Sequence, residues 1–204
     1  TLIPTQSDKL AEPMKQYMDE ALLPSLYAAM DKTEWEMTPY VYARTTPDKG
    51  IAAFLDSPRY SSGYAALQFS YSFMPETHML KSFAARVKST HAFIHAMLVH
   101  IKDNKTKLVA SRGDAVVATI QADSLDIDWS LDQNKEDSLM FKGYTAITKK
   151  SKVTGMDRLY YDHTKPYEKN IPYYKYYQPK TTISKPNAYI VPQSYRHLIE
   201  LMQL

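Results

Sequence analysis

The fold is decided by the stretch FSYSFMPET, residues 69–77, together with the segment that follows it. Phe69, Tyr71 and Phe73 alternate with small polar residues, a period of two that is typical of a β-strand. Residues 81–102 place large apolar side chains three or four positions apart, which predicts a long helix directly after the strand. A buried strand that feeds a helix is a unit of α/β architecture, so the sequence predicts an α/β domain.

The segments before this strand extend the same α/β pattern. Residues 10–30 carry an apolar stripe at four-residue spacing, which predicts a helix that Pro24 either bends or divides in two. Residues 37–42 and 51–55 predict short strands separated by a turn-rich loop. Residues 112–122 predict one further helix.

The C-terminal part of the chain predicts a different, β-rich structure. Residues 125–132 alternate strictly between apolar and acidic or small side chains, which predicts a half-buried strand. The other expected elements are strands at 138–149, 158–162, 173–177 and 188–191 and a closing helix at 195–202. We therefore expect two units, residues 1–122 and residues 123–204.

Charge and composition support this division. Residues 141–204 contain eleven Lys and Arg against four Asp and Glu, a net charge of +7, whereas the whole chain carries +3. The chain has no cysteine, which excludes disulfides, cysteine nucleophiles and thiolate metal sites. No apolar run is long enough to span a membrane and no signal peptide is visible. The abrupt start at Thr1 predicts a mature or trimmed fragment.

Glu76 is the sharpest candidate for chemistry. It lies at the end of the predicted strand, and ligands commonly bind at strand ends in α/β sheets. A partly buried carboxylate there would have a raised pKa and could act as a general base, although a helix-capping or salt-bridged glutamate would look the same. His78 would share its face if the strand continued, and could orient the carboxylate.

Two stretches carry a resemblance to a known family. PRYSSGYAAL, residues 58–67, and YSFMPETHMLK, residues 71–81, resemble the C-terminal catalytic part of the carboxypeptidase A-like zinc peptidases, in particular a branch from Bacteroidetes-type bacteria. The resemblance implies the C-terminal half of a mixed-sheet α/β domain followed by a β-rich module. It implies that Glu76 is the general base for zinc-bound water and that Tyr60 binds substrate. Arg59 could contact a substrate carboxylate, or serve as a structural loop residue.

The sequence departs from the family pattern at the metal. The family binds zinc through His-x-x-Glu and a later His, all before the catalytic glutamate, whereas the first histidine here is His78. Zinc is therefore expected for the complete enzyme, with ligands outside this chain. The resemblance further implies a peptide substrate, pairing with the missing upstream half or with a second copy, and a periplasmic or extracellular location. An unpaired half-domain would expose apolar surface.

The basic C-terminal part supports an alternative, non-catalytic function. The run YYKYY, residues 173–177, could recognise a peptide or a glycan, or it could form the aromatic face of a β-sheet. No nucleic-acid-binding motif accompanies these residues, so we expect no nucleic-acid partner. His91 and His95 are four positions apart, but they lack the glutamate of a His-Glu-x-x-His motif and are expected to be core or surface residues.

Overall fold

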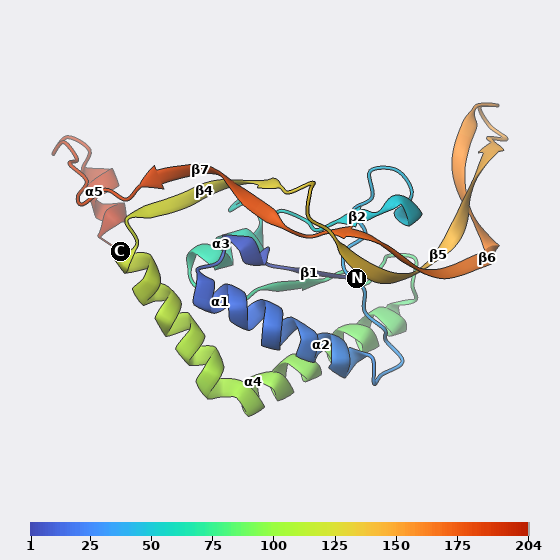
Figure 1. The fold of residues 1–204 in the computed structure, drawn as a ribbon, viewed down its shortest axis with the longest axis horizontal. Helices are drawn as coiled ribbons and strands as arrows, with labels where there is room; N and C mark the ends of the chain where they lie inside the picture. Colours follow the sequence, from blue (N-terminus) through green and yellow to red (C-terminus); the bar gives the residue numbers. More distant parts are fainter. Residues whose placement is uncertain (204) are drawn as a thin grey trace.

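The computed structural model describes residues 1–203 as a helical body with β-ribbons along one side (Figure 1). The chain therefore combines helices with a mixed sheet, which agrees with the predicted α/β class. The elements, in chain order, are β1 (Leu2–Pro4), η1 (Ser7–Lys9), α1 (Glu12–Tyr17), η2 (Met18–Leu22), α2 (Leu23–Met30), η3 (Pro47–Lys49), β2 (Ile51–Ala52), α3 (Ser61–Leu67), β3 (Phe73–Pro75), α4 (Phe83–Gln121), β4 (Ser124–Leu131), β5 (Asp137–Lys150), β6 (Asp157–Tyr174), β7 (Tyr177–Ser184) and α5 (Arg196–Met202).

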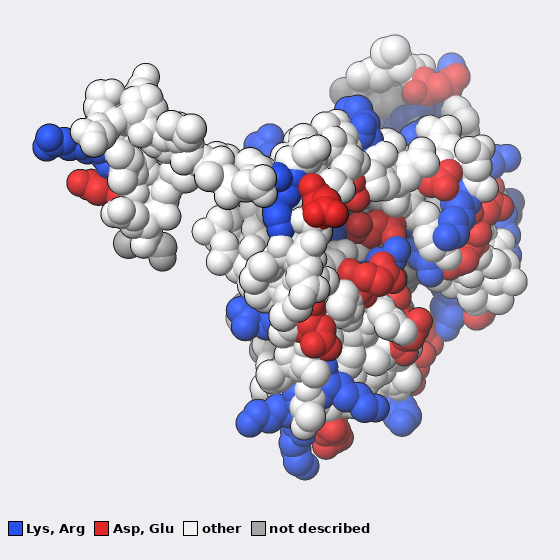
Figure 2. Space-filling model, turned by 60° about the vertical axis from the view of Figure 1, so that its left-hand side comes forward, with Lys and Arg blue, Asp and Glu red and all other residues white. Residues whose placement is uncertain are grey.

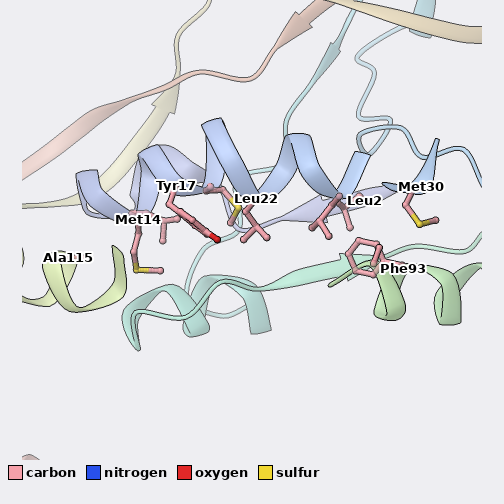
Figure 3. Packing of buried hydrophobic residues seen from close by; sticks show 11 residues of the cluster. Leu2, Met14, Tyr17, Leu22, Met30, Phe93 and Ala115 are labelled. Atoms are coloured by element: carbon pink, nitrogen blue, oxygen red, sulfur yellow. The ribbon is translucent and has the colours of Figure 1, made fainter. Parts of the chain in front are cut away.

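The predicted N-terminal helix is present as three consecutive segments, α1, η2 and α2. Its apolar stripe is buried, and η2 is a π-helical segment. Pro24 lies at the start of α2, where the π-helical segment η2 passes into α-helix, and the backbone angles given for Leu22 and Leu23 are helical. The stripe packs on β1 and α4 to form the main core, part of which is shown in Figure 3.

The two predicted helices at 81–102 and 112–122 are one helix, α4, with a bend. Asn104 has non-helical backbone angles, φ −123° and ψ 18°, and its side-chain amide donates to the carbonyl of His100 at 3.1 Å. The predicted gap between the two helices is therefore present only as a bend at Asn104 within a single helix. Phe93 and Ala115, on either side of the bend, are both buried in the main core.

The predicted strand over residues 69–77 is wrong in length. Only Phe73–Pro75 form a strand, β3, which pairs antiparallel with β1, with Ile3 opposite Met74. Phe69 has a φ of +51°, a left-handed conformation that follows the end of α3. The first residues of the expected strand are therefore used to leave α3, and β1–β3 is a two-stranded pair.

The β-rich part consists of two long ribbons. β5 and β6 form an antiparallel hairpin, and β2 adds to β6 in parallel to make a mixed three-stranded sheet, with Ile51 opposite Tyr173. β4 pairs with β7. The strands predicted at 158–162 and 173–177 were wrong in extent: the first is part of the long strand β6, and the second spans the end of β6 and the start of β7.

Two other predicted strands are absent from the described residues. No strand forms at 188–191, and residues 37–42 contribute only isolated bridges at Pro39 and Tyr42. The closing helix is present as α5, which has no buried residue. Figure 2 shows a small lobe joined to the body by a narrow neck, and Figure 1 places α5 at that outlying end of the chain.

The two predicted units are joined by hydrogen bonds from the N-terminal segment. The side-chain amide of Gln6 donates to the carbonyl of Lys175 at 2.7 Å, and the backbone N–H of Tyr177 donates to Asp8 Oδ2 at 2.7 Å. With the β2–β6 pair, these contacts place the β6–β7 junction against the helical body.

Candidate functional site

Glu76 lies directly after β3, at the rim of a hollow of about 280 Å³. Its backbone N–H donates to the carbonyl of Thr1 at 2.8 Å, which fixes the backbone at the end of the strand. Its side chain is exposed and takes part in no hydrogen bond or ion pair among the described residues. The structure thus presents a free carboxylate at the strand end, whereas the sequence suggested a partly buried one.

The hollow has an apolar floor and a charged rim. Phe93 and Met30 come from the main core, and Trp35, which packs against that core, also lines the hollow. Lys81 and Glu36 also line it, and Glu36 is engaged by Lys142 of β5 at 2.7 Å. Its remaining lining residues are Thr1, Met37, Thr38, Pro75, Glu76, Thr77, His78 and Ser89.

His78 forms its hydrogen bonds with the turn before α4 and none with Glu76 among the described residues. Its Nδ1 accepts a hydrogen bond from the backbone N–H of Leu80 at 3.2 Å, and its carbonyl accepts from Lys81 N–H at 3.0 Å. The expected shared face required the strand to continue to residue 77, but β3 ends at Pro75. His78 therefore shapes the turn into α4 and lines the hollow beside Glu76 without contacting its carboxylate through a hydrogen bond.

Tyr60 and Arg59 lie at the start of α3. Tyr60 is the N-cap residue, and its ring packs edge-on against Phe54 at 5.0 Å between centroids. The Arg59 guanidinium lies 5.8 Å from the centre of the Tyr60 ring, and both side chains are exposed. Arg59 forms no ion pair among the described residues, so it is available to an anionic group.

The loop that carries these two residues is held by buried polar contacts. Asp56 is fully buried and accepts from the backbone N–H of Gln6 at 3.1 Å and from the Lys9 ammonium at 2.6 Å. The Lys9 ammonium also contacts the Asp56 carbonyl. Asp56 Oδ2 has no hydrogen-bond partner among the described groups. The N-terminal segment therefore anchors the loop ahead of Tyr60.

Gly63 fixes the position of α3 against the same loop. A Cβ built on Gly63 would meet the backbone carbonyl oxygens of Ser57 and Asp56, the latter at 2.5 Å. No side chain fits there without moving backbone, so the close approach requires glycine. The glycine in the sequence YSSG thus has a packing function next to the substrate-binding candidates.

The structure groups the predicted site residues in two pairs. Glu76 and His78 line one hollow, whereas Arg59 and Tyr60 do not line it and lie at the start of α3. No sequence signal pointed to Lys9 and Asp56, because they are 47 positions apart and only the fold brings them together.

The described residues do not fit a zinc ion. No group of three or more His, Asp or Glu side chains comes together anywhere in residues 1–203. No step of a reaction can therefore be assigned to a metal held by this chain alone.

Comparison of the chain with protein-family models, with curated proteins and with solved structures finds no match. None of the helices formed by the described residues combines the length and the apolar character that crossing a membrane requires.

Proposed function

We propose that this chain is part of a zinc metallocarboxypeptidase and supplies its general base, Glu76. The observation that carries the proposal is the state of this carboxylate. It is exposed, free of ion pairs among the described residues, and placed at the end of β3 on the rim of a hollow. Such a group can take a proton from water and return it to the leaving amine as the peptide C–N bond breaks.

The other half of the site would come from outside this chain. Zinc ligands are absent from the described residues, so they would belong to an upstream half of the domain or to a second copy. Arg59 and Tyr60 would meet the C-terminal carboxylate of a peptide substrate. Arg59 offers two parallel N–H donors, which match the geometry of a carboxylate. The proposal places such a protein in the periplasm or outside the cell.

The alternative is a non-catalytic peptide- or glycan-binding module. The contacts of the tyrosine-rich segment, residues 173–177, give it less support than Glu76 gives the first proposal. The Tyr177 hydroxyl donates to the carbonyl of Ala53 at 2.9 Å, and the Tyr176 hydroxyl donates to Asp137 at 3.0 Å. Burial raises the pKa of Tyr173 to about 12. Tyr177 therefore contacts the loop at Ala53, Tyr176 contacts β5 and Tyr173 is partly buried, rather than forming a free aromatic surface.

The test uses the protein purified from its own cells, in the complex that it forms there. Zinc content is measured by elemental mass spectrometry, and loss of C-terminal residues from a set of peptides is measured by mass spectrometry. We expect Glu76→Gln to lower turnover by at least about 100-fold while zinc content stays the same, since general-base catalysis contributes about 10²–10⁴-fold.

Glu34→Gln, another exposed glutamate, is the matched control and should leave turnover unchanged. Unchanged turnover in Glu76→Gln would show that the catalytic assignment is wrong. A natively purified protein without zinc or turnover would instead favour the binding module.

A further inference from the structure

One continuous face of α4 is apolar and exposed. Its large side chains, each between 38% and 74% exposed, recur three or four positions apart with one gap at His91 and are Phe83, Val87, Ile94, Leu98 and Ile101. The opposite side of the same helix is already occupied, because Phe93, Ala96 and His100 are buried against α1 and α2. The N-terminal half of α4 therefore has two apolar faces, and only one of them has a partner among the described residues.

The exposed face is a narrow seam rather than a broad apolar side. At 100° per residue, its five side chains span less than a quarter of the helix circumference, as in the seam between two packed helices. A helix that lies in a membrane surface needs a wide apolar side opposite a wide polar one. In α4 the side opposite the seam is the packed core, so the pattern favours a partner helix over a lipid surface.

The surroundings of the seam are basic. Residues 81–107 contain six Lys and Arg against a single acidic residue, Asp103. Lys88 and Lys102 fall on one flank of the seam, are exposed, and form no ion pair among the described residues. Figure 2 shows Lys and Arg side chains gathered at the lower end of the molecule, the level at which α4 bends in Figure 1.

This charge argues against a second copy of the chain. In a two-fold dimer, the α4 helices of the two copies could pack antiparallel with seam against seam. The same flank of each copy would then lie on the same side of the interface. Lys88, His95 and Lys102 of both molecules would then line one edge, and like charges would face each other. A partner with carboxylates on its flanks meets the same lysines favourably.

We propose that this seam is the docking site for an acidic amphipathic helix of another polypeptide segment. Apolar side chains of the partner fill the seam between Phe83 and Ile101, and flanking Glu or Asp side chains pair with Lys88 and Lys102. The inference does not require Glu76 to be catalytic. Its test measures binding without turnover, so the two proposals can fail separately.

The test uses two synthetic helical peptides of about three heptads, with Leu at the two core positions of each heptad. One carries Glu at the flanking positions and the other carries Lys, so charge repulsion keeps each peptide monomeric. Binding to the 204-residue chain is measured by fluorescence anisotropy. We expect the Glu peptide to bind, more weakly at high salt, and the Lys peptide to bind at least about tenfold more weakly.

Two variants and one control separate the apolar and the charged contributions. Leu98→Glu should weaken binding of the Glu peptide at least about tenfold, because it places a charge within the seam. Lys88→Glu combined with Lys102→Glu should reverse the preference toward the Lys peptide. Val153→Glu, at the exposed tip of the β5–β6 hairpin, should change nothing.

Three results would overturn the inference. The first is equal binding of the two peptides, or binding of neither. The second is a dimer in analytical ultracentrifugation that Leu98→Glu dissociates, which would assign the seam to a second copy. The third is binding to vesicles of phosphatidylcholine and phosphatidylglycerol, without binding of the Glu peptide, which would assign it to a membrane surface.

Discussion

The Lys9 ammonium lies 2.6 Å from the carboxylate of Asp56, and the two side chains are 7% and 0% exposed. This pair joins η1 to the loop that precedes Tyr60, and it is the most deeply buried of the ion pairs among the described residues. A buried pair is strongly destabilised when only one partner is removed, because the other charge is left without compensation.

We therefore expect Lys9→Met to lower the free energy of unfolding by about 3–5 kcal/mol. The measurement is urea denaturation followed by circular dichroism. Lys150→Met removes one partner of the exposed pair with Asp157 and should have a much smaller effect. Equal effects of the two substitutions would show that burial of the Lys9–Asp56 pair does not govern its contribution.

Gly63→Ala should be destabilising, by about 1–3 kcal/mol, because the new methyl group meets backbone carbonyls rather than a movable side chain. Gly113→Ala is the matched control, since Gly113 lies within α4 with nothing near its Cβ. There the change should stabilise by about 0.5–1 kcal/mol. Opposite signs in urea denaturation are the expected result, and two changes of the same sign would contradict the close approach at Gly63.

Stability should fall at acid pH through His100. This side chain is 5% exposed and hydrogen-bonds to Ser25 Oγ and Tyr17 Oη, each at 2.8 Å. Burial lowers the pKa of His100 below its ordinary value of 6.5, an effect that Asp103 opposes. The unfolded state therefore takes up the proton first as pH falls, and stability is lost from about pH 6.5 downward until the folded state is protonated too.

The measurement is urea denaturation at pH 7.5 and at pH 5.0. We expect His100→Gln to reduce the difference in unfolding free energy between the two pH values, and the exposed substitution His197→Gln to leave it unchanged. A pH difference that persists in full in His100→Gln would assign the acid sensitivity to other groups.

Removal of the segment from residue 188 onward should leave stability almost unchanged. α5 has no buried residue, and the backbone of Lys185, which contacts Asp123, is retained. We expect the free energy of unfolding to change by less than about 1 kcal/mol. Truncation after Pro179 removes most of β7 and should be clearly destabilising, because β4 then loses its partner strand. Equal losses in the two truncations would mean that α5 packs on the body.

The sequence predicted elements well where the signal is local. The stripe from Leu10 to Met30 was confirmed as a buried helical face, because a period of about four reports one side of a helix. The strand at residues 188–191 was wrong because a strand also needs a partner, and no such partner is encoded locally. Phe69 was misassigned since alternation does not reveal the left-handed turn that ends α3.

Burial was harder to predict than secondary structure. In α4 the stripe containing Val87, Ile94 and Leu98 looks like a core face, yet it is exposed, and Phe93 lies in the core. Helical period shows that a face is apolar but not whether another segment covers it. For the same reason the sequence could not show that Glu76 lines a hollow that Tyr60 does not line, because this depends on how distant segments pack.

The junction between Gln6, Asp8 and residues 175–177 also bears on synthesis. These hydrogen bonds join positions 169 apart, so the first helices leave the ribosome well before their partners exist. Gln6 and Asp8 therefore lack these partners until residues 175–177 have been made. Contacts of such long sequence separation slow folding. The segment that holds Gln6 and Asp8 therefore reaches its final set of hydrogen bonds only when the β6–β7 junction has formed.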